Sequence, residues 1–351
     1  MPYAASQSGF FVALMWLAVL GLVMTVVHLM QGEVLLRTEA RHRLPGLART
    51  YIGAWAGRSL LASEVVGLSA SLLIYIVLGA AFLDALFPGN QNIVFLAVAF
   101  WCVFTIPEIF GLRVLAGLEL VLTGALLVFL VAVTFFLVPH VAAPNLVSVA
   151  APRLFLPYGV TLFALFGISG IPLVREVFGS SKGLGRVIVV GTALPVVLYA
   201  FFVFAVVGVT GQATSPEAIF GLGKMFGYPM VAAGAVMGLL AVSTSYLTLA
   251  AYVRDEIRLD LRIPRITSLG ILVIPIAAFL LGVRDFIAIA AIAGTIIGAV
   301  DGSMVAYMWY RAKSRGDRKP EYKVPLPFLV SFGIIALFVG AAILELALII
   351  F

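Results

Sequence analysis

Charged residues are scarce in this chain. Asp, Glu, Lys and Arg make up only 11% of its 351 residues, whereas 63% of the residues are hydrophobic. A soluble domain carries roughly 25% charged residues. This deficit excludes a water-soluble globular protein and indicates that most of the chain lies in lipid.

Cysteine is nearly absent, and the signatures of enzymes are missing. Cys102 is the only cysteine and lies inside an apolar run, which excludes a disulfide framework or a cysteine-based metal site. The three histidines share no ligand spacing, and no His-Glu-x-x-His motif occurs. The run 167–171 lacks the glycine that a nucleophile elbow needs at its fifth position. We therefore expect neither an enzyme nor a protein that carries a resident metal or cofactor.

Long apolar runs dominate the chain instead. Runs of this length and composition are typical of helices that cross a bilayer, which takes about 20 residues. We see no separate soluble domain, so we expect an all-α integral membrane protein with one transmembrane domain over residues 1–351. The sequence predicts about ten full spans, at 10–36, 59–84, 91–111, 114–138, 155–177, 185–210, 228–253, 267–282, 285–309 and 326–350.

Basic residues are distributed unevenly between the two sides that this order of spans defines. Nineteen of the 22 Lys and Arg residues fall in connections on one side, and only Arg153, Lys224 and Arg284 fall on the other. Connections rich in Lys and Arg lie in the cytoplasm. The excess of positive charge therefore indicates topology and not nucleic-acid binding, and we expect a multi-pass protein of the cell (plasma or inner) membrane.

One apolar run is interrupted where a spanning helix should continue. Residues 166–172 read Phe-Gly-Ile-Ser-Gly-Ile-Pro, in the middle of a run without charge. Irregular backbone at membrane depth survives only where it lines a cavity or binds something polar. We therefore predict a substrate site at the backbone and side chains of Phe166, Gly167, Ile168, Ser169 and Gly170. The alternative is a kinked helix whose glycines pack closely on a neighbour.

The broken ends also suggest what such a site would bind. The first half-helix would present free C=O groups and the second would present free N–H groups. A zwitterionic amino acid offers an ammonium and a carboxylate that match both ends. The hydroxyl of Ser169 would add a polar contact, and Phe166 would bound the side-chain pocket.

Two groups of residues are candidates for ion coupling. Ser243, Thr244 and Ser245 offer three successive hydroxyls for Na⁺, which takes oxygen ligands; the alternative is hydrogen bonding to carbonyls of the preceding turn. An acidic residue within a span is a functional candidate by default. Among the acids near spans, we place Asp301 and Glu108 ahead of the others, which are Glu64, Glu119 and Glu345.

Small residues recur at the spacing of close helix packing. Gly234 and Gly238 form one such pair, and Gly294 and Gly298 form another. Glycines four residues apart let two helices approach closely. We interpret both pairs as packing features.

The two halves of the chain show a weak internal symmetry. Pro2 is followed by Gly9, and Pro172 is followed at the same distance by Gly179. Proline suits the first turn of a helix, so both prolines are expected to begin half-helices. Corresponding broken helices mark inverted-repeat transporters. Since the topology also places Met1 on the outer side, we expect the first helix to be a stub that is truncated at the N-terminus.

Three stretches resemble the amino acid/auxin permease branch of the amino acid–polyamine–organocation superfamily, especially its prokaryotic tryptophan/tyrosine-type permeases. They are Pro2-Tyr3-Ala4 with Gly9-Phe10, the stretch 163–172 with 184–188 and Gly191-Thr192, and Thr244-Ser245-Tyr246-Leu247 with Arg254-Asp255. The resemblance implies an inverted-repeat (5+5) fold of eleven helices and adds Pro2 and Tyr3 to the expected substrate site. The family's first break and inner half-helix have no counterpart before Met1.

From these observations we expect a secondary active transporter that moves a neutral or aromatic amino acid with H⁺ or Na⁺ by alternating access. Na⁺ would be a coupling ion and not a cofactor. The alternatives are a channel or carrier for another small solute, and a truncated membrane protein that transports nothing. The sequence leaves the particular amino acid, the ion, the direction of transport and the oligomeric state open.

Overall fold

The computed structural model describes residues 1–39, 42–89, 92–110, 115–148, 153–178, 183–261, 264 and 268–350. Within these ranges every regular element is a helix. In chain order the elements are α1 (Pro2–Ser8), α2 (Phe10–Leu36), α3 (Leu44–Tyr51), α4 (Ala54–Leu86), α5 (Ile93–Phe110), α6 (Leu115–Leu137), η1 (Val138–His140), η2 (Ala143–Leu146), α7 (Leu156–Leu165), α8 (Gly170–Phe178), α9 (Leu184–Thr210), η4 (Gly211–Ala213), α10 (Ile219–Phe226), α11 (Tyr228–Leu261), η5 (Leu269–Leu272), α13 (Val273–Leu280), α14 (Phe286–Ile297), η6 (Gly298–Gly302), α15 (Ser303–Arg315) and α16 (Leu329–Ile350).

Each of the ten ranges expected to span the membrane contains helix. In the described part of the chain, six helical stretches are long and apolar enough to cross a bilayer. They are Phe10–Leu36, Ala54–Leu86, Thr123–His140, Leu184–Ala213, Tyr228–Arg254 and Phe286–Arg315. Four further apolar helices are shorter, namely Ile93–Glu108, Leu156–Pro172, Leu269–Leu280 and Leu329–Glu345. The chain is thus an all-helical protein built largely from apolar helices.

Breaks or irregular turns interrupt several of the described helices. The predicted break is confirmed, because α7 ends at Leu165 and α8 begins at Gly170. Gly170 itself is the first residue of α8 and not part of the break. At the N-terminus, α1 begins at Pro2 and is separated from α2 by Gly9, whose φ of 116° suits only glycine without strain. Between α14 and α15 lies a π-helical turn, η6, which sequence reasoning missed.

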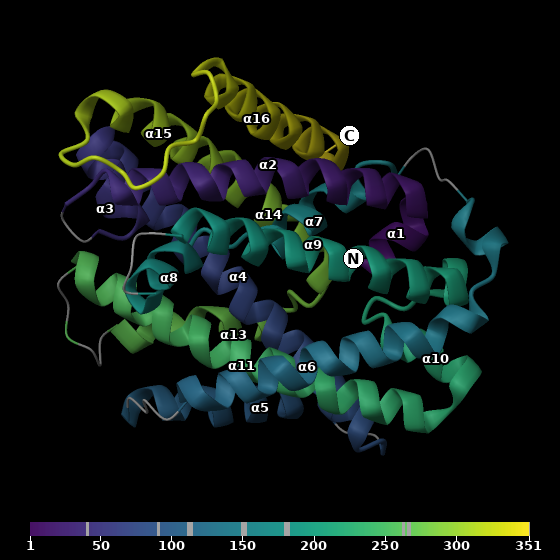
Figure 1. The fold of residues 1–351 in the computed structure, drawn as a ribbon. Helices are drawn as coiled ribbons and strands as arrows, with labels where there is room; N and C mark the ends of the chain where they lie inside the picture. Colours follow the sequence, from purple (N-terminus) through teal and green to yellow (C-terminus); the bar gives the residue numbers. More distant parts are fainter. Residues whose placement is uncertain are drawn as a thin grey trace.

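The long helices run side by side in a bundle (Figure 1). α15 and α16 form one edge of it, α5 and α6 form the opposite edge, and α2, α9 and α4 lie between them. The interior contains two large apolar clusters. One joins α2 to α7, α15 and α16, and the other joins α4 to α5, α11 and α13.

Glycines allow α7 and α14 to cross at backbone contact. A Cβ built on Gly294 would lie 2.1 Å from the carbonyl oxygen of Gly159, and one on Gly159 would lie 2.3 Å from that of Ala291. Gly298 is similarly close to the side chain of Leu162. The predicted packing role of Gly294 and Gly298 is confirmed, and their partner is the half-helix that leads into the break.

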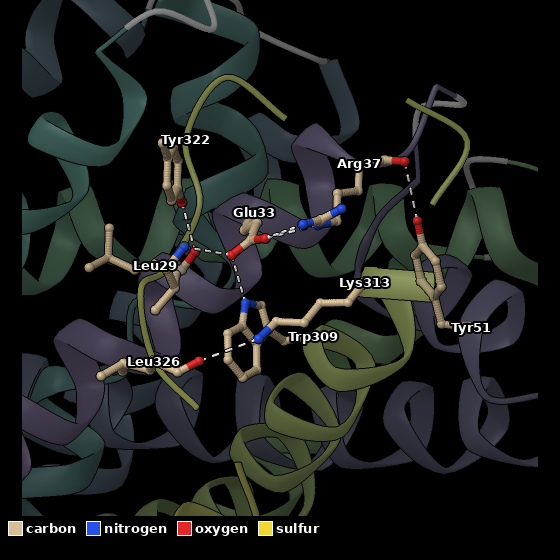
Figure 2. Close-up of polar contacts among 9 residues, drawn as sticks. Leu29, Glu33, Arg37, Tyr51, Trp309, Lys313, Tyr322 and Leu326 are labelled. Carbon is tan, nitrogen blue, oxygen red and sulfur yellow. Dashed lines mark hydrogen bonds and ion pairs between the residues drawn. The ribbon is translucent and has the colours of Figure 1, made fainter. Parts of the chain in front are cut away.

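At the end of the bundle that carries the basic connections, a buried carboxylate joins three segments. Glu33 of α2 is fully buried and accepts hydrogen bonds from the indole of Trp309 and the backbone N–H of Val324, both at 2.7 Å (Figure 2). It also forms an ion pair with Arg37, at 2.7 Å. The connection before α16 is held to α2 again by Tyr322, whose hydroxyl donates to the carbonyl of Leu29 at 2.7 Å.

Replacing Glu33 by alanine is expected to destabilise the protein strongly. The change would leave the N–H groups of Trp309 and Val324 and the guanidinium of Arg37 without their shared acceptor, and breaking such a buried set costs about 3–5 kcal/mol. Thermal unfolding of the purified protein in detergent measures the loss. The matched control is Glu321→Gln, which breaks the half-exposed ion pair with Arg318 and should cost less than about 1 kcal/mol. Equal stability of the two variants would contradict the prediction.

Candidate functional site

The interrupted helix borders a cavity of about 410 Å³ between the two apolar clusters. It is lined mainly by residues of α4, α7, the break and α14, with single residues from α9, α11 and η6. We call this space the central cavity. Its size lies within the range of small-molecule sites in proteins. The polar residues that line it include Ser71, Tyr75, Ser169 and Tyr199, together with the two acids Glu64 and Asp301.

The break leaves backbone groups for a ligand to use. Gly170 and Ile171 donate their N–H groups to the carbonyls of Gly167 and Ile168, closing the first turn of α8. Among the described residues, the hydrogen bonds present use neither the N–H of Ile168 nor that of Ser169. These groups lie at the start of a helix, where partial positive charge gathers. The break can therefore bind an anionic group such as a carboxylate.

Aromatic side chains also line the central cavity. Phe166 comes from the break itself, Tyr75 from α4 and Tyr199 from α9. The side chain of Tyr75 lies near Ser245 of α11. The cavity thus combines an anion-binding helix start with rings that suit an apolar or aromatic side chain.

Of the seven residues expected to bind substrate, the structure brings two to the central cavity, Phe166 and Ser169. Gly167 and Gly170 line a separate side cavity of about 270 Å³, between the break and α9. Ile168 is fully buried in the first apolar cluster. The packing of the break therefore decides which of its residues a ligand can reach.

The remaining two expected residues lie in α1. Pro2 is buried at the start of that helix, while Met1 beside it lines the central cavity. Tyr3 lines an outer cavity of about 600 Å³, at the side that has few basic residues. This outer cavity holds charges of both signs, including Arg153, Glu217 and Arg284, and burial raises the pKa of Glu217.

The two acids that we ranked first have different surroundings. Asp301 lies in the π-helical turn η6, is 1% exposed and lines the central cavity. Such turns inside α-helices occur frequently at functional sites. Glu108 of α5 instead forms a buried ion pair with Arg254 of α11, and it is not among the residues that line the central cavity. Of the lower-ranked acids, Glu64 of α4 lines the cavity, whereas the side chain of Glu119 lies outside the described part.

The three successive hydroxyls lie in α11, beside the central cavity but not in its lining. Thr244 donates to the carbonyls of Leu240 and Ala241, at 3.1 and 3.0 Å, as the alternative interpretation expected. Ser245 lies near Tyr75, and Ser243 is buried. A hydroxyl that donates to its own helix retains lone pairs that can coordinate a cation, so the sodium site stays a prediction.

Sequence reasoning missed several residues of the site. Tyr199, which lines the central cavity, carried no local signal, and the buried Glu33, which lies outside this site, also went unnoticed. His28 received no role because it has no ligand spacing, yet it is buried against the break. The glycines that flank Val300 and Asp301 in η6 were the one sequence signal that pointed to an irregular turn there.

Comparisons with known proteins agree with this geometry. The model of the tryptophan/tyrosine permease family matches residues 1–345. Among solved structures, the crystal structure of MhsT in complex with L-phenylalanine is similar, with a TM-score of 0.61 and 14% sequence identity. The match covers 99% of this chain and 93% of that chain, and at such low identity it shows the fold. None of the curated proteins matches this chain.

Proposed function

Because the chain belongs to the tryptophan/tyrosine permease family, we propose that it is a secondary active symporter that moves an aromatic amino acid together with protons across the cell membrane. It is a multi-pass membrane protein for amino acid transport, and it is not an enzyme. Substrate class, coupling ion and the particular membrane are the parts that we propose.

The observation that carries this proposal is the break at 166–169 on the central cavity. The N–H group of Ser169 at the start of α8 would bind the substrate carboxylate. The free carbonyls at the end of α7 would bind the ammonium. Phe166, Tyr75 and Tyr199 would surround the side chain, and the solved structure of MhsT holds an aromatic amino acid, L-phenylalanine.

Protons are the better candidate for the coupling ion, because two acids line the same cavity as the break. Asp301 comes from η6 and Glu64 from α4. Burial destabilises the charged form of a carboxyl group, and protonation removes this penalty. An acid that lines the cavity can therefore take up a proton when the substrate closes the cavity off from water. Sodium at Ser243, Thr244 and Ser245 is the alternative, supported by the closeness of Ser245 to Tyr75.

Alternating access follows from where the central cavity lies. We propose that the clusters around α2 and α4 move as two bodies and open the cavity to each side in turn. The short half-helix α1 and the broken pair α7 and α8 would be corresponding elements of an inverted repeat. A site at the interface of such repeats is the arrangement that this mechanism needs.

Uptake into proteoliposomes tests the function. We expect the purified protein to accumulate radiolabelled L-tryptophan, L-tyrosine or L-phenylalanine when the outside is acidic, and to lose accumulation when a protonophore is added. L-alanine and L-lysine should accumulate far less. Liposomes without protein are the control, and pH and Na⁺ gradients are varied separately. Absence of amino acid accumulation under either gradient would overturn the proposal, and uptake that only equilibrates would favour a channel.

A further inference from the structure

Helix α2 contacts the broken helix along one of its faces. His28 and Gln31 bond to the break, and the carbonyl of Leu35 accepts from the guanidinium of Arg175 in α8, at 2.7 Å. These three positions are spaced three and four residues apart, so they share one face of an α-helix. Helix α2 therefore runs alongside the break and the start of α8.

The contact made by His28 fixes the form of its ring. Its Nε2 accepts the backbone N–H of Gly167 at 3.3 Å, so this nitrogen carries no proton. The proton of the neutral ring is then on Nδ1, which lies 2.9 Å from the hydroxyl of Thr192. Thr192 in turn donates to the carbonyl of Ile188 at 2.9 Å. In this chain of three hydrogen bonds, Gly167 donates to His28, His28 donates to Thr192, and Thr192 donates to a carbonyl of α9.

Gln31 makes the complementary contact one helical turn away. Its side-chain amide donates to the carbonyl of Ile168 at 2.9 Å, and Gln31 is 1% exposed. Two side chains of α2 thus form hydrogen bonds with the break: His28 accepts from the N–H of Gly167, and Gln31 donates to the carbonyl of Ile168. Both side chains are buried, where a lost hydrogen bond is costly.

We propose that His28 and Gln31 are positioning residues that fix the backbone of the break in its binding conformation. By bonding Gly167 N–H and Ile168 C=O, they set the peptide planes so that the N–H group of Ser169, in the same peptide unit as the Ile168 carbonyl, stays available at the start of α8. His28 does not line the central cavity, so it acts on a substrate through the break. This inference rests on the proposed transport function.

The test uses variants that change the chain of bonds at different distances from the break. His28→Leu removes the acceptor for Gly167, whereas His28→Gln retains an acceptor and a donor. Thr192→Val removes the partner of Nδ1 without touching the break, and Thr192→Ser keeps it. Thr25→Val is the matched control on α2, because the hydroxyl of Thr25 donates to Gly21 of its own helix.

Two measurements are made on each variant in nanodiscs or proteoliposomes. Hydrogen exchange of the peptide that contains residues 166–169 reports the break without any substrate. We expect exchange about tenfold faster in His28→Leu and Thr192→Val, which corresponds to the loss of one buried hydrogen bond. Uptake of L-tryptophan in the same variants should show KM raised about tenfold with the maximal rate retained. His28→Gln, Thr192→Ser and Thr25→Val should resemble the parent in both measurements.

The outcomes separate the two proposals. Unchanged exchange in both His28→Leu and Thr192→Val would overturn the positioning role, whatever the uptake shows. A lower maximal rate with unchanged KM would also overturn it, because that pattern indicates a structural role only. A parent protein that accumulates no amino acid, but whose exchange responds to His28→Leu, would overturn the proposed function while retaining the contact to the break.

Discussion

Replacing Asp301 by asparagine is expected to abolish accumulation of the substrate against its gradient. Asparagine has nearly the shape of a protonated aspartate but can neither take up nor release a proton. Because Asp301 is buried in η6 and lines the cavity that the break borders, its loss should uncouple transport from the pH gradient. Accumulation of L-tryptophan in proteoliposomes should fall to the level of liposomes without protein, while exchange of internal for external substrate continues.

The control for this experiment is Asp84→Asn. Asp84 lies on α4, is exposed and does not line the central cavity, so neutralising it removes one carboxylate without touching the site. The variant Glu64→Gln shows whether the other acid that lines the cavity shares the coupling role. Accumulation by Asp301→Asn that still responds to the pH gradient would exclude Asp301, and accumulation driven by Na⁺ alone would favour Ser243, Thr244 and Ser245.

The second large effect is structural and concerns Gly294. A Cβ at this position would lie 2.1 Å from the carbonyl oxygen of Gly159 and 2.8 Å from the backbone nitrogen of Phe163. Both atoms belong to the backbone of α7, which cannot move without displacing the break. Overpacking usually costs about 1–3 kcal/mol, and we expect Gly294→Ala at the upper end and Gly294→Leu to give no folded protein.

Thermal unfolding and size-exclusion chromatography in detergent measure this effect. Gly191→Ala in α9 is the matched control, because a Cβ at Gly191 meets no atom within 4 Å. In a helix interior alanine is favoured over glycine by about 1 kcal/mol, so the control should be as stable as the parent or slightly more stable. A Gly294→Ala variant with the parent's unfolding temperature would show that α7 and α14 can separate at no cost.

The sequence predicted the features of this protein that depend on short stretches of chain. Apolar runs identified the helices because a run of the right length is stable in lipid wherever its neighbours lie. The glycines and proline at 166–172 identified the break for the same reason, since their effect on helical hydrogen bonding is local. The motifs around these stretches were enough to indicate the permease family, which the family match over residues 1–345 confirmed.

Only the tertiary structure distinguished residues that look alike in the sequence. Asp301 and Glu108 are both acids in apolar helices, but Glu108 is paired with Arg254, 146 residues away, whereas Asp301 lines the cavity. Gly167 and Ser169 are two residues apart, yet one lines the side cavity and the other the central cavity. His28 contacts the break from 139 residues away. Such differences depend on how each helix is rotated about its own axis against its neighbours. That rotation is set by side-chain packing between segments that are distant in the sequence. The composition and residue spacing of one segment do not determine this packing.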